Sequence, residues 1–263
     1  MLILLSNDDG IYADGLIAMY QALAESADVR VVAPATAQSG GSHAITIRHP
    51  VLWKTVQVGD IFQGTSVEGT PADCVKLAIH SLLPRKPDLV VAGINAGLNS
   101  GVHVLYSGTV AAAIQGAIQG CPAIAVSMEL YRDMDFPAAA RIAMRLIDRI
   151  VQRSLHPGQV FSINIPEIRP GWPRGVRVAS QSVQAMVERV EERADPNGRR
   201  YYWLAGDFKD ISNEPGGNEA PPDQQTDRQA LSEGYVTVTP LQFNLTDQNL
   251  LGEMQGWSWP DVS

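Results

Sequence analysis

The stretch LLSNDDGIYADG, residues 4–15, decides the fold prediction. It begins inside an apolar run, residues 1–5, that predicts a buried strand. An amphipathic helix is predicted directly after the stretch, because apolar side chains recur at helical spacing at Leu16, Met19, Tyr20 and Leu23. In a dinucleotide-binding fold the turn between strand and helix is rich in glycine and holds a pyrophosphate. Here the turn carries two adjacent carboxylates instead, Asp8 and Asp9.

The first two-thirds of the chain alternates predicted strands and helices. Apolar runs predict further strands at 29–34, 88–93, 122–128 and 160–166. Caps and helical spacing predict helices that start at Thr70-Pro71 or cover 109–119 and 136–155. Apolar runs without strict alternation suit a parallel sheet that is covered on both faces. We therefore predict a doubly wound, Rossmann-like α/β core with a mostly parallel sheet over residues 1–166.

Two β-hairpins are predicted besides this alternation. AITI (44–47) and VLWKTV (51–56) resemble a hairpin inserted after the second strand. DPNG (195–198) is typical of a hairpin turn that leads into a return strand. Residues 167–263 are accordingly predicted to form a hairpin-rich C-terminal extension of the same compact unit.

The rest of the extension is predicted as a loop, a helix, a strand and a tail. Residues 213–225 are rich in Pro, Gly and Asn, which indicates a long loop. Thr226 is placed to cap a short helix that stops at Gly234, and YVTVTPL (235–241) predicts a strand. The polar tail from Thr246 is predicted to lie over the surface or on a partner.

Composition and charge exclude several classes of protein. The 263 residues carry a net charge of −8, and no Lys/Arg cluster forms the basic face that a nucleic-acid polymer requires. No apolar run approaches the roughly 20 residues of a membrane span, so no membrane partner is predicted. Cys74 and Cys121 lie in apolar segments and are predicted to be small core residues. This usage of cysteine predicts a cytoplasmic protein.

Polar or glycine-rich residues follow the carboxyl ends of the predicted strands, where open α/β sheets bind ligands. They are Asn7, Asp8 and Asp9 after the first strand, Ser39, Gly40, Gly41 and Ser42 after the second, Asn95 and Asn99 after the strand at 88–93, and Ser107, Gly108 and Thr109 at the start of the alanine-rich helix. We expect these loops to share one edge of the sheet.

The acidic pair predicts a divalent cation. Two neighbouring carboxylates repel each other unless a proton or a cation intervenes. A hydroxyl and an amide oxygen from the other loops would complete an all-oxygen set, which suits Mg²⁺, Mn²⁺ or Ca²⁺. No His or Cys has the spacing of a zinc site. The structural alternative is that Asp8 caps the following turn and Asp9 faces solvent.

The motifs SGGS (39–42) and YSGT (106–109) predict contacts to a phosphate. Small residues let backbone N–H groups approach an anion, and a helix N-terminus favours negative charge. A tight loop and an ordinary helix cap would explain the same motifs. His43 and His103 are candidates for the acid that protonates a leaving group, whereas structural roles are favoured for His49, His80 and His156.

Several motifs together resemble the SurE, or survival protein E, family of nucleotidases. They are SNDDG, AP…QSG, GTPADCVKLA, GIN.G.N.G (93–101), YSGTV and GYVTVTPL, and the resemblance runs from Met1 to about Thr246. Ala92 and Ala111 depart from the family pattern, in which Ser and Gly are expected. The loop at 215–222 and the tail after Gly252 fit the pattern poorly.

The resemblance implies a Rossmann-like fold, a divalent metal and hydrolysis of nucleoside monophosphates. Family members also include enzymes that cleave 3′-nucleotides or short polyphosphate. The family's metal ligands correspond to Asp8, Asp9, Ser39 and Asn95. The resemblance further implies a homodimer or homotetramer built partly through the C-terminal extension.

We therefore predict a phosphatase for nucleoside 5′-monophosphates with one divalent metal ion per subunit. Asp8 and Asp9 are the predicted catalytic residues. Asn7, Asn99, residues 40–42 and residues 107–109 are predicted to bind the phosphate and the rest of the substrate. Two alternatives stay open: a metal-dependent nucleotide sensor without turnover, and a structural protein that holds Ca²⁺.

Overall fold

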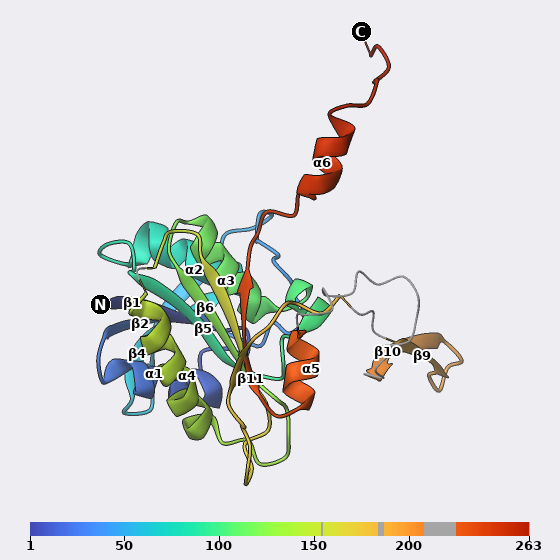
Figure 1. Ribbon diagram of the computed structural model, residues 1–263. Helices are drawn as coiled ribbons and strands as arrows, with labels where there is room; N and C mark the ends of the chain where they lie inside the picture. Colours follow the sequence, from blue (N-terminus) through green and yellow to red (C-terminus); the bar gives the residue numbers. More distant parts are fainter. Residues whose placement is uncertain (154, 184–186, 208–224, 263) are drawn as a thin grey trace.

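The computed structural model describes residues 1–153, 155–183, 187–207 and 225–262. Among these residues, nine strands form one sheet in the order β3-β4-β2-β1-β5-β6-β7-β11-β8 (Figure 1). Neighbouring strands run parallel except for the β3–β4 and β7–β11 pairs. The predicted doubly wound α/β fold with a mostly parallel sheet is confirmed.

The core alternates strands and helices as predicted. Its strands are β1 (Leu2–Ser6), β2 (Asp28–Pro34), β3 (Leu52–Val58), β4 (Phe62–Glu68), β5 (Leu89–Ala96), β6 (Ala123–Met128) and β7 (Val160–Ile165). Its α-helices are α1 (Asp14–Ala24), α2 (Pro71–Leu77), α3 (Gly108–Ile118) and α4 (Phe136–Val151). A π-turn, η1 (Ala78–Leu82), extends α2, and a 3-10 turn, η2 (Gly101–Leu105), precedes α3.

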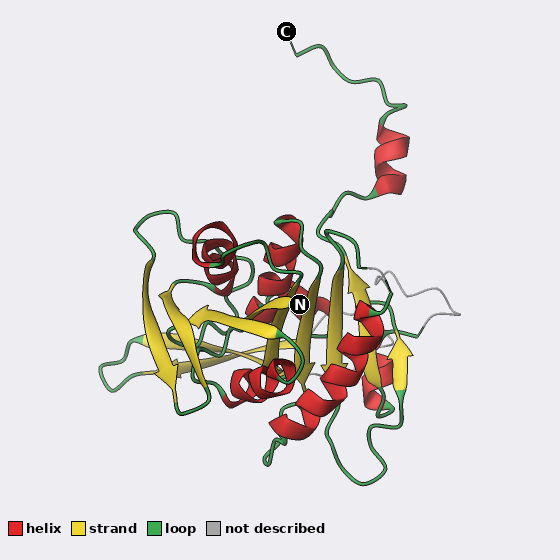
Figure 2. Ribbon diagram, turned by 90° about the vertical axis from the view of Figure 1, so that its left-hand side faces the viewer, coloured by secondary structure: helices red, strands yellow, loops and turns green. Residues whose placement is uncertain are grey.

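Helices cover both faces of the sheet (Figure 2). Successive side chains of a strand point to opposite faces. Ile3 and Leu5 of β1 accordingly pack in the cluster that includes α1 and α4, whereas Leu4 packs with α2 and α3. Strands that are buried on both sides explain why the sequence shows continuous apolar runs rather than alternation.

The C-terminal extension contributes strands to the main sheet and a separate hairpin. Its elements are β8 (Val176–Val178), β9 (Val187–Ala194), β10 (Arg200–Asp207), α5 (Asp227–Ser232), β11 (Val236–Leu241) and α6 (Gln248–Met254). β9 and β10 form the hairpin predicted at DPNG. Thr226 caps α5 as predicted, and the following segment forms β11. β8 and β11 lie next to β7, so the extension continues the core sheet, and the boundary at residue 166 stays a prediction.

One local prediction is wrong, and another lies largely outside the described residues. AITI (44–47) forms no strand; the hairpin consists of β3 and β4 instead. The Thr46 amide donates to both carboxylate oxygens of Asp73, at 3.0 and 3.2 Å. The amide of this segment therefore bonds a side chain and not a neighbouring strand. Of the two placements predicted for the tail, the one over the body of its own chain is not observed, since the tail forms α6 and projects away (Figure 1); contact with a partner stays a prediction. Of the loop predicted at 213–225, only Gln225 belongs to the described residues.

Candidate metal and phosphate site

Asp8 follows β1 and is held by the N-terminus of α3. Its side chain is 5% exposed, and its Oδ1 accepts a hydrogen bond from the Thr109 hydroxyl. Burial raises the pKa of Asp8, and the neighbouring charge of Asp9 adds to this effect, while the hydrogen bonds from Thr109 oppose it. The folded protein therefore keeps a carboxylate at a place where an isolated negative charge is unfavourable.

Asp9 lies beside the end of β5. Its Oδ2 accepts a hydrogen bond of 3.1 Å from the Ala96 amide. Burial raises the pKa of Asp9 as well, against the effect of this hydrogen bond. Asp9 is thus tied to β5, and the proposed alternative of a carboxylate that only faces solvent does not describe its surroundings.

Asn95 precedes this contact in β5. Its Nδ2 donates to the Gly97 carbonyl oxygen at 2.7 Å. Because the nitrogen is engaged in the local turn, Oδ1 is the side-chain atom that is left to accept from a donor or to ligate a cation. The Asp9–Ala96 bond joins the acidic pair to the residue that follows Asn95.

The loop after β2 is also joined to the acidic pair. The Gln38 amide donates to the Asp8 carbonyl oxygen at 2.7 Å, which brings the exposed Ser39 to this edge of the sheet. Gly40 has φ +71°, and a Cβ added there would meet no atom within 4 Å. The backbone at Gly40 is therefore open to a ligand. The Gly41 amide donates to the Gln38 carbonyl oxygen at 3.1 Å and closes the turn.

Ser42 connects this loop to the segment before α3. Its hydroxyl donates to the Leu105 carbonyl oxygen at 2.7 Å, and its amide donates to the Tyr106 carbonyl oxygen at 3.0 Å. Both groups are thus engaged within the protein. These contacts favour a structural role for Ser42 and place SGGS beside YSGT, as the sequence predicts.

The first turn of α3 approaches Asp8 closely. A Cβ on Gly108 would lie 2.7 Å from Asp8 Cβ and 2.9 Å from Asp8 Oδ2, so only glycine fits. Ser107 is the N-cap: its Oγ accepts from the Val110 amide at 3.0 Å, and its own amide donates to the His103 carbonyl oxygen at 3.1 Å. The capping role of Ser107 is therefore clear, and a phosphate contact from its amide would replace an existing bond.

Asn7 and Asn99 are engaged in internal networks. The Asn7 amide group bonds both polar groups of Gly10, at 2.9 and 3.2 Å, and so closes the turn after β1. Asn99 Nδ2 donates to Ser127 Oγ at 2.8 Å, and the main chain of Asn99 bonds the Asn164 side chain. Both asparagines are buried. These contacts favour a structural role for Asn7 and Asn99, in which they support the site, over the predicted contact with substrate.

The two candidate histidines have partners within the chain. His43 Nε2 lies 2.9 Å from Gln115 Oε1 on α3. Burial lowers the pKa of His103, and the positive charge of Arg228 lowers it further, against a hydrogen bond that the ring donates to the backbone of Leu98. His103 is thus shifted toward its neutral form, which makes it a weaker candidate for a general acid.

The donor set fits a hard cation rather than zinc. Within the described ranges, no group of three or more His, Cys, Asp and Glu side chains converges on one point. A cation near Asp8 and Asp9 would therefore need oxygen ligands of other types. Asn95 Oδ1 and the Ser39 hydroxyl are candidates, because each belongs to a residue next to one whose amide bonds Asp9 or Asp8. The resulting all-oxygen set suits Mg²⁺, Mn²⁺ or Ca²⁺.

Asp227 is a buried acid that sequence reasoning missed. It is 1% exposed, and its carboxylate accepts hydrogen bonds from the amides of Gly101, Ser182 and Arg228. Burial raises the pKa of Asp227, while these amides and the Arg228 charge oppose the shift. Its local signal, an acid in the first turn of a capped helix, gives no indication of the bond to Gly101, 126 positions earlier in the chain.

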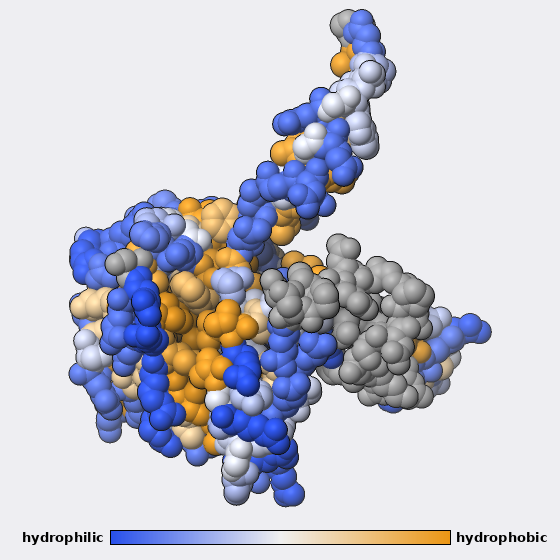
Figure 3. All heavy atoms as spheres, viewed as in Figure 1, coloured by the Kyte–Doolittle hydropathy of each residue, from blue (hydrophilic) through white to orange (hydrophobic). Residues whose placement is uncertain are grey.

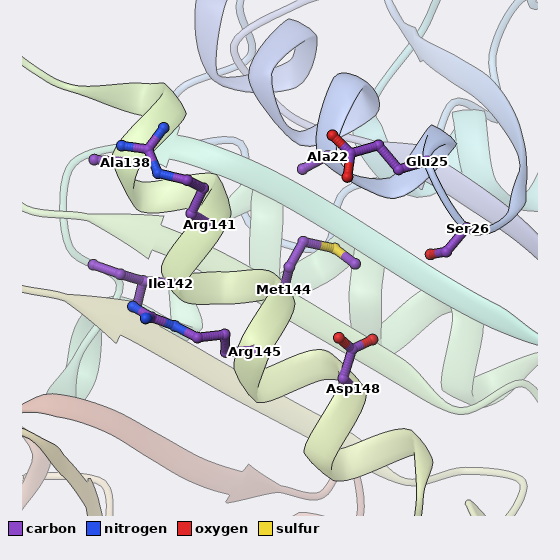
Figure 4. Close-up of a pocket in the computed structure, with 9 residues that line it drawn as sticks. All are labelled: Ala22, Glu25, Ser26, Ala138, Arg141, Ile142, Met144, Arg145 and Asp148. Atoms are coloured by element: carbon purple, nitrogen blue, oxygen red, sulfur yellow. The ribbon is translucent and has the colours of Figure 1, made fainter.

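A separate hollow lies between α1 and α4 (Figure 4). It has a volume of about 670 Å³, and Glu25 lines it from the α1 side, opposite Arg141, Arg145 and Asp148 of α4. None of the predicted site residues lines this hollow. It therefore contributes nothing to the candidate site.

The fold and the site define an α/β protein of the doubly wound class, with an acidic pair at the carboxyl edge of a parallel sheet and beside a helix N-terminus. The profile of the family described as Survival protein SurE matches residues 3–188, and the chain belongs to this family.

Relatives and a solved structure support this assignment along nearly the whole chain. A protein of Rhodopirellula baltica named 5′-nucleotidase SurE is 46% identical over 259 residues, which cover 98% of this chain and 99% of the relative. A protein of Syntrophobacter fumaroxidans with the same name is 41% identical and covers 98% of this chain and 100% of the relative. The crystal structure of the SurE protein from Aquifex aeolicus matches with a TM-score of 0.80 and 34% identity, covering 97% of this chain and 98% of that one.

Proposed function

We propose that this protein is a 5′-nucleotidase, a phosphatase that hydrolyses nucleoside 5′-monophosphates to nucleoside and phosphate. The observation that carries the proposal is the position of Asp8 and Asp9 between β5, the loop after β2 and the first turn of α3. The names of the family's relatives agree with this activity. We extend the proposal to 3′-nucleotides and short polyphosphate as further substrates.

The proposed metal ligands are Asp8, Asp9, Ser39 and Asn95. The raised pKa values of the two carboxyl groups support this choice, because a cation would supply the positive charge that their surroundings lack. A bound Mg²⁺ or Mn²⁺ would polarise the phosphoryl group and offset its negative charge. Ca²⁺ is a further possible occupant, because it also prefers oxygen ligands.

The residues around the cation would position the phosphate and the attacking water. Gly40 is open to a ligand, and the first turn of α3 at Gly108 and Thr109 provides the positive end of a helix dipole. These backbone groups would stabilise charge on the phosphate oxygens. Asp8 or Asp9 would orient or deprotonate the water, whose oxygen forms a bond to phosphorus as the bond to the 5′ oxygen breaks. The 5′ oxygen would leave with a proton, returned by that carboxyl group or supplied by solvent water.

The test is phosphate release from a panel of nucleotides. AMP, GMP, CMP and UMP, a 3′-nucleotide and tripolyphosphate are each assayed with Mg²⁺, Mn²⁺ or Ca²⁺, and with EDTA as the metal-free control. We expect release from 5′-monophosphates that stops in EDTA and returns when metal is added. Metal-dependent binding of AMP without release would favour the sensor, and metal-dependent melting without either would favour a structural Ca²⁺ site.

We further propose a homodimer or homotetramer formed through the C-terminal extension. The tail stands clear of the body and mixes hydrophobic with hydrophilic residues (Figure 3). Leu245 is 84% exposed and Trp259 is 61% exposed, and Trp257 packs against Trp259. Apolar side chains held away from their own chain are typical of a contact with a second subunit. This arrangement supports the prediction that the tail lies on a partner.

The proposed location is the cytoplasm. Cys74 and Cys121 are both free and buried, which suits a reducing compartment. In a separate observation, the helices of the described residues include none with the length and apolar character needed to cross a bilayer.

A further inference from the structure

The carboxylate of Asp227 joins three segments that are distant in the sequence. Its Oδ2 accepts from the Gly101 amide at 2.8 Å, and its Oδ1 accepts from the Ser182 amide at 3.0 Å and the Arg228 amide at 2.8 Å. Only the last of these amides belongs to α5. Because the side chain is 1% exposed, water cannot readily replace a lost acceptor.

Capping of α5 does not require these contacts. Thr226 and Gln229 already form a reciprocal capping box at the start of this helix. The bonds from Asp227 to Gly101 and Ser182 therefore serve the connection between segments and not the helix alone.

Gly101 is held by the C-terminal extension at both of its polar groups. Its amide donates to Asp227, and its carbonyl oxygen accepts from Gln181 Nε2 at 3.0 Å. It has φ +58°, and an added Cβ would lie 3.0 Å from Arg228 Cδ and 3.2 Å from the Ser182 carbonyl oxygen. The close fit leaves Gly101 little freedom to move.

The clamped glycine lies within the loop that connects two parts of the candidate site. This loop starts after Asn95, in β5, and ends at Ser107, the cap of α3. Asn164 holds the loop at Asn99, and Asp227 holds it at Gly101. A shift at Gly101 would pass through η2 to Ser107, whose amide bonds the His103 carbonyl oxygen.

We propose that Asp227 is a positioning residue for the phosphatase site: through Gly101 it fixes the loop between Asn95 and the N-terminus of α3. The inference rests on the proposed function. It assigns to the C-terminal extension a direct part in the geometry of the site. Asp227 touches neither the metal nor the phosphate in this scheme, and it acts by holding the loop.

The test compares Asp227→Asn with Thr226→Ala. The asparagine keeps the size of the side chain but has one acceptor oxygen fewer for the amides of Gly101 and Ser182. Thr226→Ala weakens the cap of the same helix and leaves the bond to Gly101 in place. We expect Asp227→Asn to lower kcat for AMP by about 10- to 100-fold and to raise the metal concentration for half activity. Thr226→Ala should change kcat and the metal concentration for half activity by less than about twofold, even if it lowers Tm as much as Asp227→Asn does.

Hydrogen exchange tests the clamp without any activity. Amides of residues 99–106 should exchange faster in Asp227→Asn than in the wild type, and at the wild-type rate in Thr226→Ala. If the wild type releases no phosphate, the proposed function fails, whereas the exchange comparison still tests the clamp. Unchanged exchange and unchanged kcat in Asp227→Asn would overturn the inference, as would an equal loss of kcat in Thr226→Ala.

Gln181→Leu is the second variant, and it decides the matter if Asp227→Asn does not fold. It removes only the bond to the Gly101 carbonyl oxygen. We expect faster exchange of the same loop amides and a smaller decrease in kcat. Wild-type exchange together with wild-type kcat in a folded Gln181→Leu would also overturn the inference.

Discussion

The hydroxyl of Thr109 donates a hydrogen bond to Oδ1 of Asp8, across 101 positions of the chain. This contact joins the end of β1 to the first turn of α3. It fixes one carboxylate of the acidic pair and leaves its charge beside the positive end of a helix. The bond explains how the protein holds an acid with a raised pKa at a defined position.

Asp8→Asn should separate activity from stability. Loss of the carboxylate is expected to lower turnover of AMP by at least about 100-fold, because metal placement and charge stabilisation are both lost. The Tm in EDTA should stay equal to that of the wild type or rise, because a neutral amide avoids the burial of charge at Asp8. Phosphate release and thermal melting measure the two effects. Near-normal release by a folded variant would exclude Asp8 from the site.

Asn95→Ala should weaken metal binding rather than lower the stability of the fold. The variant loses the only side-chain oxygen that β5 offers to the proposed cation and the bond from Nδ2 to Gly97. We expect the Mn²⁺ concentration for half activity to rise about tenfold or more, with kcat largely restored at high metal. Titration of activity with metal at saturating AMP measures this shift. An unchanged titration midpoint would remove Asn95 from the ligand set.

Two glycines of α3 provide a matched pair of variants, Gly108 at the candidate site and Gly116 in the core. A Cβ on Gly108 would press on Asp8, whereas a Cβ on Gly116 would press on Val90 at 2.7 Å, in the core. Each Ala variant should lose about 1–3 kcal/mol of unfolding free energy through overpacking. Only Gly108→Ala should also lose activity, by tenfold or more, because it displaces Asp8. Urea unfolding and AMP hydrolysis are measured on both variants, and equal activity losses would contradict the specific role of Gly108.

Asp88 should make stability depend on pH. Arg85 donates two hydrogen bonds to its carboxylate, at 2.7 and 2.8 Å, and the Leu2 amide donates a third, at 2.7 Å. These contacts lower the pKa of Asp88 from 3.8 to about 2. The folded state prefers the ionised form of Asp88. The stabilisation from this carboxylate is therefore complete above the pKa that Asp88 has in the unfolded chain, and it is lost as pH falls toward about 2.

The variant Asp88→Asn tests this effect. Its urea midpoint should lie below that of the wild type from about pH 5 upward, and the difference should shrink as pH falls from about 4 to 2. High salt should reduce the difference, since the ion pair with Arg85 is largely exposed. A difference between the two proteins that is the same at pH 2.5 and pH 7 would contradict the assignment.

Removal of residues 246–263 should abolish or reduce assembly. This deletion takes away α6 with the exposed Trp257 and Trp259, and it leaves Leu245 in place. Light scattering after gel filtration should show a lower subunit count for the truncated chain. The double variant Trp257→Ser/Trp259→Ser keeps the tail length and should show the same loss. A full-length chain that already runs at 28.4 kDa would contradict the proposed oligomer.

Local signals predicted most of the fold. Thr70 with Pro71 begins α2, Thr226 caps α5, and DPNG turns between β9 and β10, because each signal acts within a few residues. AITI misled the prediction for the same reason. Its apolar residues suggested a strand, but the Thr46 amide bonds the Asp73 carboxylate, and Ile47 is 80% exposed. A side chain 27 positions away satisfied the backbone instead of a neighbouring strand.

The candidate site was predictable as a set of loops but not as a set of contacts. The strand-end rule placed Asp8, Asn95 and Thr109 at one edge of the sheet. It did not reveal that Thr109 holds Asp8, or that Ser42 and Asn7 use their polar groups within the protein. Such partners depend on rotamers and backbone geometry that residue type alone does not fix.

The sequence by itself determined the alternation of strands and helices in the core, the buried character of the sheet and the acidic pair after the first strand. Periodicity, caps and turn residues encode these features, and they act over short distances along the chain. Only the tertiary structure decided that Asp227, in the C-terminal extension, bonds Gly101, 126 positions away. Such a pair forms because packing of the whole chain buries both groups at one place, where each needs a hydrogen-bond partner that water cannot supply.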